Sequence, residues 1–418
     1  MPETPGLLPR ARLSTPSVSA RVSPVVTLST ITRLIASGAA TTNAEIVEAT
    51  GLSRSVVTSG LDELIRAGIV QRANRRYAPG RGRNATQHQL GRGAGLIMSA
   101  DIGDRSIRLA VADLDQHVLA RYKQTARVNE GPEPVLDVVV TQLRRMLIEV
   151  GDPHRALALG VALPGRVDRN GVPASTPFLS SWAGFPVAST LSRQLGCHVS
   201  VEDVASVRAL GEARVLPPKS LPLLFVVADR GIGTGLIGID GQLHQGASGS
   251  AGSVAHMWIG QLGGEECACG KDGCLDSVAS GEAMLHKISR MLPEPAPTTM
   301  PELEQLIRAR EPSVMRALEA SGEALGGLLS GLVTFYNPAE LVLDGTLAWA
   351  SDDFLNIIRS VVYRRAAPLA TRDLVINTSR LRQSAGMVGC FVLALEHLLA
   401  PDNLTRMIRQ RADPQLRP

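Results

Sequence analysis

The strongest constraint on the fold is a set of short apolar runs that end in, or lead into, an acidic residue or a glycine-containing turn. Continuous apolar runs of this length are typical of strands buried on both faces of a sheet. The runs are 96–102 with Asp101-Ile102-Gly103, 157–162 with Pro164-Gly165, 223–228 with the glycines at 231–235, and 341–343 with Asp344-Gly345. Because the pattern occurs in both halves of this region, we predict a duplicated α/β fold with a cleft between two lobes.

Further elements fill in this body of the chain. We expect strands at 108–113, 118–122 and 199–201, an amphipathic helix over 135–150, and a helix that ends at Arg214. The Gly-Ile-Gly-Thr-Gly stretch at 231–235 is expected to form a turn, since such turns let backbone N–H groups approach phosphates in the actin-like ATPases. These features together favour an actin-like (ribonuclease H-like), two-lobed fold for the body.

A different pattern precedes this body. Helical spacing of apolar residues, a capping box and a suitable N-cap residue predict three short helices. They are a helix over 27–37 ended by Gly38, one opened by Thr42-Asn43-Ala44-Glu45, and one over 54–67 that follows Ser53 and ends at Gly68. After them, 69–72 and 86–90 can pair as a β-ribbon. This layout is that of a winged helix-turn-helix.

The third of these helices offers polar side chains on the face opposite its apolar stripe of Val57, Leu61, Leu64 and Ile65. In helix-turn-helix proteins the first turns of the last helix reach base edges in the major groove. The candidate DNA-binding residues on the helix are Arg54, Ser55, Thr58 and Ser59, and those on the ribbon, where guanidinium groups can meet phosphates or the minor groove, are Arg75, Arg76, Arg81 and Arg83. A plain three-helix packing module is the alternative.

Charge is distributed unevenly along the chain. The net charge is +4, but residues 1–92 carry 12 Arg, no Lys and 5 acidic residues, so that this part is +7 and the remainder is −3. A basic N-terminal part favours contact with a polyanion such as double-stranded DNA. No run has the length of a membrane span and no segment resembles a signal peptide, so we expect a cytoplasmic protein without a membrane partner.

Three of the five cysteines, Cys267, Cys269 and Cys274, fall within one short stretch. This clustering is typical of a metal site in a reducing compartment rather than of a disulfide framework. Gly270 and Gly273 between them allow a tight loop in which three thiolates converge. Unrelated buried thiols or a disulfide are the alternatives. Cys197 and Cys390 belong to no such pattern and are expected in the core.

Several of these motifs together resemble the ROK family (repressors, open reading frames and sugar kinases). They are Pro164-Gly165-Arg166-Val167-Asp168, the glycines at 231–235, His256, the cysteine motif through Leu275, and Tyr336-Asn337-Pro338. The resemblance spans about residues 25–400, and the helix-turn-helix with Gly80-Arg81-Gly82-Arg83 is typical of the family's repressor branch.

The resemblance also implies a division of the chain and a ligand set for the metal. We expect a disordered arm at 1–24, the winged helix-turn-helix at 25–92, a sugar-kinase-like domain at 93–400 and a tail at 401–418. His256 matches the family's fourth ligand. With Cys267, Cys269 and Cys274 it would close a tetrahedral, structural Zn²⁺ site in a loop at 256–276.

The catalytic motifs of the family are altered in this chain. Active members carry Asp-Ile-Gly-Gly-Thr-Lys, whereas this chain has Asp101-Ile102-Gly103-Asp104-Arg105-Ser106, which places a carboxylate where phosphates would lie. Active members also carry Glu-Asn-Asp-Ala-Asn before Leu-Gly-Glu. Counted from Leu210-Gly211-Glu212, Val204 occupies the position of the catalytic base and Asp203 that of the Asn. A slip of one residue on a helix rotates a side chain by about 100°, so we do not expect Asp203 to substitute.

The sugar contacts of the family are altered as well. Pro177-Phe178-Leu179 lacks an Asn, Ser253-Val254-Ala255-His256 lacks a Glu, and Leu275-Asp276 is one methylene shorter than Leu-Glu. The remaining candidate ligand-binding residues are Glu202, Asp203, His256 and Asp276. Asp276 is either a pocket residue or a loop cap. Any effector should differ from the usual hexose, unless the body serves only as a dimerisation scaffold.

Taken together, the sequence predicts a DNA-binding transcriptional regulator, a repressor of carbohydrate-related genes, whose kinase-like body is not an enzyme. Its expected partners are a double-stranded DNA operator, a second copy in a homodimer or homotetramer, and a sugar or sugar-derivative effector. The alternative is an ATP-dependent sugar kinase with an accessory DNA-binding domain. A third hypothesis is a ligand-independent architectural or activator protein.

Overall fold

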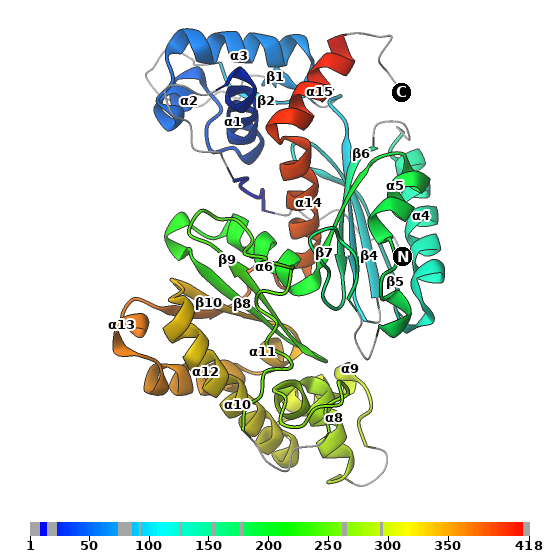
Figure 1. Cartoon of the computed structure of the whole chain (residues 1–418), viewed down its shortest axis with the longest axis vertical. Helices are drawn as coiled ribbons and strands as arrows, with labels where there is room; N and C mark the ends of the chain where they lie inside the picture. Colours follow the sequence, from blue (N-terminus) through cyan, green and yellow to red (C-terminus); the bar gives the residue numbers. More distant parts are fainter. Residues whose placement is uncertain are drawn as a thin grey trace. The chain divides into compact units, whose positions relative to one another are not determined.

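The structure is a computed structural model, shown in Figure 1. It describes residues 9–14, 23–73, 86–91, 93–104, 106–125, 128–151, 156–174, 179–260, 266–292 and 296–412. The chain divides into two compact units, which we describe separately. The first consists of Met1–Leu163, Pro186–Val201 and Met387–Pro418, and the second of Pro164–Phe185 and Glu202–Gly386.

The first unit begins with three helices and a two-stranded ribbon. The elements are α1 (Pro24–Ser37), α2 (Asn43–Thr50), α3 (Arg54–Arg66), β1 (Val70–Arg72) and β2 (His88–Leu90). The Thr42–Glu45 capping box is formed, Ser53 accepts from the N–H of Val56, and β1 pairs with β2 in antiparallel fashion. The three predicted helices and the predicted antiparallel ribbon are therefore present. Helix α1 begins three residues earlier than predicted because Pro24, at its first position, has a fixed φ that suits a helix.

Side chains from each of these helices form a small core. Ile31, Ile35, Ile46, Leu61 and Leu64 are all buried, with exposed fractions of at most 2%. Gly60 on α3 lies against α1, since a Cβ atom there would lie 3.0 Å from Cδ1 of Ile31. The close approach of these two helices turns the opposite side of α3 toward solvent.

A mixed five-stranded sheet forms the rest of the first unit, in the order β5-β4-β3-β6-β7. Its strands are β3 (Leu96–Ile102), β4 (Ser106–Asp113), β5 (Val118–Thr125), β6 (Ala156–Leu163) and β7 (His198–Asp203). Strand β3 is antiparallel to β4 and parallel to β6. The accompanying helices are η1 (Val128–Glu130), α4 (Pro132–Glu149), α5 (Val187–Leu195) and α14 (Ala385–Leu398).

Helix α14 packs tightly on this sheet. A Cβ atom at Gly160 of β6 would lie 2.0 Å from the carbonyl oxygen of Cys390, so only glycine permits this approach. Cys390 is completely buried and Cys197 is 8% exposed, which confirms both as core residues. Residues 401–412, predicted as the start of a tail, instead form helix α15 (Pro401–Ala412), which packs against α1 and buries Leu404. Helix α15 has few apolar residues, so its buried face gives too short a helical pattern to be predicted from the sequence.

The second unit contains a four-stranded sheet in the order β11-β10-β8-β9. Its strands are β8 (Leu223–Ala228), β9 (Ile232–Ile237), β10 (Glu340–Asp344) and β11 (Val375–Thr378). Strand β8 is antiparallel to β9 and parallel to β10, which repeats the relation of β3 to β4 and β6 in the other sheet. This repetition confirms the predicted duplicated α/β fold.

The expected glycine turn at 231–235 is wrong in part. Only Gly231 lies in the turn, and the remaining residues belong to strand β9. The glycines are required by packing: a Cβ atom at Gly235 would lie 2.5 Å from Cβ of Ala209, and one at Gly233 would lie 3.0 Å from Cβ of Ala205. Both alanines are on helix α6 (Val204–Val215), so the glycines let this helix lie directly on β9.

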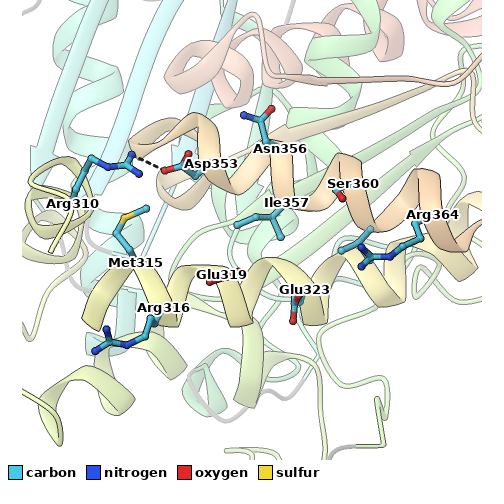
Figure 2. Close-up of a pocket in the computed structure, with 11 residues that line it drawn as sticks. Arg310, Met315, Arg316, Glu319, Glu323, Asp353, Asn356, Ile357, Ser360 and Arg364 are labelled. Carbon is cyan, nitrogen blue, oxygen red and sulfur yellow. Dashed lines mark hydrogen bonds and ion pairs between the residues drawn. The ribbon is translucent and has the colours of Figure 1, made fainter. Parts of the chain in front are cut away.

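The remaining helices of the second unit surround its sheet. They are η2 (Ser180–Trp182), η3 (Pro218–Ser220), α7 (Asp276–Ala279), α8 (Gly281–Ser289), α9 (Met300–Arg308), α10 (Pro312–Tyr336), α11 (Thr346–Ala350), α12 (Asp352–Arg365), α13 (Pro368–Thr371) and η4 (Arg382–Ser384). Helices α10 and α12 are closely packed through Gly322 and Gly326. Between them runs a charged groove of about 520 Å³, with an ion pair of 2.7 Å between Arg310 and Asp353 at one end (Figure 2).

Within the described part of the chain, no single helix is long and apolar enough to cross a membrane. One bent pair, Arg382–Leu398 with Pro401–Arg411, meets the length and composition criteria together. In this structure the pair contributes to the core of the first unit through Cys390, Leu395 and Leu404.

Candidate functional site

The cysteine motif forms a compact loop in the second unit. Trp258 and Cys274 form an isolated antiparallel bridge, and Ile259 donates to the carbonyl of Gly273 at 2.9 Å. Gly270 and Gly273 both have left-handed φ values, +78° and +70°. These two glycines permit the reversals that return the third cysteine to the histidine.

The four predicted metal ligands lie together in this loop. The ligand atoms of His256, Cys267, Cys269 and Cys274 are all within 4.8 Å of one another. Nδ1 of His256 lies 3.5 Å from Sγ of Cys267, and the Sγ atoms of Cys269 and Cys274 are 3.6 Å apart. A tetrahedral ion with bonds of about 2.3 Å to sulfur and about 2.0 Å to nitrogen would place its ligands roughly 3.5–3.8 Å apart. The cluster therefore fits a four-coordinate metal ion and is too widely spaced for a disulfide.

The protonation of the thiols also favours a cation here. Burial raises the pKa of Cys267, and burial together with the neighbouring thiols raises the pKa of Cys274 to about 12. Three thiolates this close would repel one another strongly without a positive charge between them. A bound metal ion removes this penalty, because coordination deprotonates the thiols.

Asp276 begins helix α7 immediately after the cysteine motif. Its Oδ1 accepts a hydrogen bond from the N–H of Ile232 at 2.8 Å, at the start of strand β9. Burial raises the pKa of this carboxyl group. Asp276 was expected to be either a pocket residue or a loop cap. The hydrogen bond from Ile232 is the contact of a loop cap, and it connects the cysteine loop to the turn between β8 and β9.

Asp203 is the N-cap of helix α6, and Val204 is the first residue of that helix. Oδ1 of Asp203 accepts from the N–H of Ser206 at 3.0 Å, and Oδ2 accepts from Oγ of Ser206 at 2.6 Å. The second oxygen also forms an ion pair of 2.9 Å with Nη1 of Arg166. Both oxygens are therefore engaged by donors of the protein, and the side chain is 7% exposed.

Arg166 is a site residue that the sequence alone did not single out, although it lies in the motif at 164–168. Besides the pair with Asp203, its Nη2 donates to the carbonyl of Thr234 at 3.3 Å. A guanidinium directly after Pro164-Gly165 was the available signal, but its partner could not be identified without the fold. Arg166 thus links the motif at 164–168, the N-terminus of α6 and strand β9.

Glu202 lies beside this pair and is 4% exposed. Burial and the adjacent charge of Asp203 raise the pKa of Glu202 to about 7. Its carboxyl group accepts from the N–H of Asp203 at 3.1 Å and from the side chain of Gln245. The structure therefore brings Glu202 and Asp203 together. It places His256 and Asp276 on the cysteine loop of the same unit.

In the first unit, the altered phosphate motif begins in strand β3. Asp101 is completely buried and lies 3.5 Å from Nη1 of Arg108 on β4. Asp104 is exposed in the bend that follows. The altered segment Pro177-Phe178 and Arg105 lie outside the described residues.

Helix α3 carries the candidate DNA-binding residues. Arg54, Ser55, Thr58 and Ser59 are all exposed, whereas Val57, Leu61 and Leu64 are buried against the other helices. Asn43 of α2 donates to Oγ1 of Thr58 at 3.4 Å and contacts Nε2 of His88 on β2 at 2.9 Å, so that this amide links α2, α3 and the ribbon. Arg75, Arg76, Arg81 and Arg83 lie outside the described residues, and their roles stay predictions.

Comparison with known proteins identifies the family. A model of the ROK family matches residues 97–397. The chain belongs to the ROK family. It is 25% identical over 359 residues to the xylose repressor of Bacillus subtilis strain 168, which covers 85% of this chain and 91% of the relative. The DNA-binding transcriptional repressor Mlc of Escherichia coli K12 is 24% identical over 349 residues, covering 81% and 85%.

A kinase of the family matches a smaller share of the chain. The glucokinase of Thermotoga maritima is 22% identical over 316 residues, which covers 72% of this chain and 98% of the kinase. Among solved structures, a ROK family transcriptional regulator described as a homologue of the E. coli Mlc protein covers 92% of this chain and 98% of its own, with a TM-score of 0.76 and 20% identity. This likeness confirms the fold over most of the chain.

Proposed function

We propose that this protein is a DNA-binding transcriptional repressor of sugar-related genes. The observation that carries the proposal is the exposed polar face of α3, with Arg54, Ser55, Thr58 and Ser59 side by side on a three-helix unit that ends in a β-ribbon. Short polar and arginine side chains in this position suit the edges of bases and the phosphates of the major groove. The proposal is supported by the larger share of this chain that a named repressor covers, 85% for the xylose repressor of Bacillus subtilis against 72% for the glucokinase.

The kinase-like body serves, in this proposal, as a scaffold and sensor without catalytic activity. Val204 has no group that can accept a proton, and both oxygens of the neighbouring Asp203 accept from Ser206 and Arg166. A general base needs a free lone pair directed at the hydroxyl that it deprotonates. We further propose that Zn²⁺ occupies the His256 and cysteine cluster, where it would have a structural role because its four ligands come from the protein.

The partners proposed for this protein follow from operator binding. A second copy in a homodimer or homotetramer would present two α3 helices to half-sites about 34–36 Å apart. Glu202, Asp203, His256 and Asp276 are the residues proposed to face a sugar or sugar-derivative effector. We propose that the protein acts in the cytoplasm, where it would meet both operator and effector.

The test is DNA capture from fragmented genomic DNA of the source organism, followed by sequencing. The wild-type protein should enrich discrete fragments, and the Arg54→Ala variant should bind the same fragments about tenfold or more weakly, as expected for loss of a base or phosphate contact. Arg372→Ala is the matched control, because Arg372 is an exposed arginine of the second unit. Equal enrichment of random fragments by the wild type, or unchanged affinity of Arg54→Ala, would contradict the proposed interface.

A direct test separates the repressor from the kinase alternative. The purified wild-type protein is incubated with ATP, Mg²⁺ and a panel of hexoses and amino sugars, and ADP release is measured. We expect none above the rate without sugar. Sugar-dependent ADP release that disappears on substitution of Asp203 would favour the kinase.

A further inference from the structure

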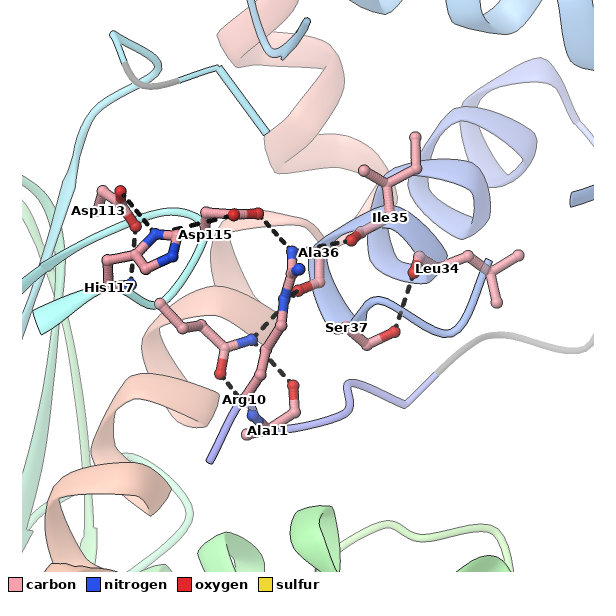
Figure 3. A network of polar contacts seen from close by, with 10 residues as sticks. Arg10, Ala11, Leu34, Ile35, Ala36, Ser37, Asp113, Asp115 and His117 are labelled. Carbon is pink, nitrogen blue, oxygen red and sulfur yellow. Dashed lines mark hydrogen bonds and ion pairs between the residues drawn. The ribbon is translucent and has the colours of Figure 1, made fainter. Parts of the chain in front are cut away.

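An ordered segment at the N-terminus, residues 9–14, was expected to belong to a disordered arm. Ala11 is completely buried and Leu13 is 6% exposed, both within the first unit. The segment makes polar contacts at its beginning, middle and end with different parts of that unit. Figure 3 shows the contacts of Arg10 and Ala11. The prediction failed because these contacts join residues that are far apart in the sequence, which periodicity does not reveal.

The first anchor of the segment is Arg10, at the C-terminal end of α1. Its Nε donates to the carbonyl of Ala36 at 2.8 Å, and its Nη2 donates to that of Ile35 at 3.0 Å. These carbonyls belong to the last turn of the helix, where the helix dipole is negative; that of Ile35 also accepts from the N–H of Gly38 at 3.0 Å. The same guanidinium pairs with Asp115 in the turn between β4 and β5, as Figure 3 shows.

The second anchor is the backbone of Ala11. Its N–H donates to Oε1 of Gln116 at 2.8 Å, and its carbonyl accepts from Nε2 of the same side chain at 2.9 Å. Nε2 of Gln116 also lies 3.3 Å from the carbonyl of Ala36 on α1. One amide in the β4–β5 turn therefore holds both the N-terminal segment and the first helix of the DNA-binding unit.

The third anchor is Ser14, which lies between α1 and α14. Its N–H donates to Oε1 of Glu396 at 2.8 Å, and its carbonyl accepts from Nη1 of Arg33 at 2.7 Å. Arg33 is a buried residue of α1, and its Nη2 reaches the carbonyl of Glu396 at 2.6 Å. The end of the segment is thus fixed between a helix of the DNA-binding unit and a core helix of the sheet.

We propose that residues 9–14 form a strap that fixes α1 on the β4–β5 turn and on α14, and that couples operator affinity to the state of this sheet. The inference rests on the proposed function, because it assigns α1 to a DNA-binding unit. The side chains of Ala11 and Leu13 are buried, but the three anchors are polar contacts, and the side chain of Arg10 is 34% exposed. Such contacts can be released without unfolding the core, in contrast to the apolar packing of α14. A shift of the β4–β5 turn is transmitted to α1 through Arg10 and Gln116, both of which contact the turn and the helix end.

The strap is tested in the full-length protein by hydrogen–deuterium exchange and DNA binding. Arg10→Ala weakens it from the side of the strap. Gln116→Asn weakens it from the side of the turn, because the shorter side chain of Asn cannot reach Ala11. Asn tolerates the left-handed backbone of position 116 (φ +67°), so the turn itself is kept. Arg145→Ala is the matched control, since Arg145 forms an exposed ion pair elsewhere in the same unit.

We expect amide exchange at 34–37 and 113–117 to rise about five- to tenfold in both variants, as loss of one or two hydrogen bonds implies, and not in the control. The affinity for the genomic fragment most enriched by the wild type should fall at least about threefold. Unchanged exchange in both variants would overturn the strap, and faster exchange with unchanged DNA affinity would overturn the coupling. If the wild type enriches no fragment, the proposed function fails, while exchange still decides whether the strap holds α1.

Discussion

The ion pair between Asp203 and Arg166 yields a quantitative prediction about the role of the inherited catalytic motif. Asp203→Asn restores the residue that the family has at this position. The amide oxygen can still accept from the N–H of Ser206, so that the cap of α6 is kept. The amide nitrogen, however, would face Nη1 of Arg166, which lies 2.9 Å from the carboxylate in the present structure. The substitution therefore removes the charge partner and leaves the helix cap.

The magnitude follows from the burial of the pair. Removing one partner of a fully buried ion pair costs about 3–5 kcal/mol, because the other charge is left without compensation. Here 18% of the Arg166 side chain is exposed, and its Nη2 keeps the carbonyl of Thr234. We therefore expect Asp203→Asn to lower the free energy of unfolding by about 2 kcal/mol.

The assay is urea unfolding followed by circular dichroism, arranged as a double-mutant cycle. Arg166→Met keeps much of the apolar length of the arginine, and the double variant Arg166→Met with Asp203→Asn removes both charges. The double variant should be more stable than the sum of the single losses predicts, with a coupling energy of about 2 kcal/mol. A coupling energy near zero would refute the reasoning, because Asp203 would then be available for another role, including that of a base.

Two further predictions concern the metal cluster and the pH dependence of stability. Cys269→Ser should abolish stoichiometric zinc binding, measured by elemental analysis, and increase proteolysis in the loop 256–276, measured by limited digestion. The control Cys197→Ala should retain the metal. Full zinc content in Cys269→Ser would disprove the ligand set. Glu202 has a pKa of about 7 in the folded protein against an ordinary value of 4.5, so its neutral form is favoured by folding and its contribution to stability is lost as the pH rises from about 4.5 to about 7. Glu202→Gln should flatten this part of the stability–pH profile, by up to the order of 3 kcal/mol, and an unchanged slope would show that Glu202 does not cause it.

The elements that could be predicted well from the sequence are those determined by a local pattern of their own residues. Strands β3 and β8 have the predicted limits, because each is an apolar run bounded by polar or glycine residues. The capping box of α2 and the cysteine motif were likewise local patterns whose chemistry could be recognised before the fold was known. The four candidate metal ligands lie together, as the family resemblance implied.

The failures share a different physical cause. Gly233 and Gly235 were assigned to a phosphate turn, since glycine permits turns, but here they allow helix α6 to approach a strand. Residues 9–14 and α15 have low apolar content, and their order depends on partners such as Gln116 and α1, which are remote in sequence. Such contacts depend on the completed fold, so a local pattern contains no record of them.

The carboxylates of the kinase-like body show why its likeness to sugar kinases concerns the scaffold more than the chemistry. Asp203 accepts from Ser206 and Arg166, Asp276 from the N–H of Ile232, and Glu212 from the N–H groups of Arg380 and Leu381. Each buried acid thus has donors from the protein, which lowers the cost of burying its charge. Three donors contact the two oxygens of Asp203, which leaves few of its lone pairs for a sugar hydroxyl. An effector that uses Asp203 as an acceptor would compete with the cap of α6 and with the ion pair to Arg166, so we expect it to change the structure at the start of α6. This dependence of binding on local rearrangement suits a sensor better than a catalyst, whose acids must be positioned before the substrate arrives.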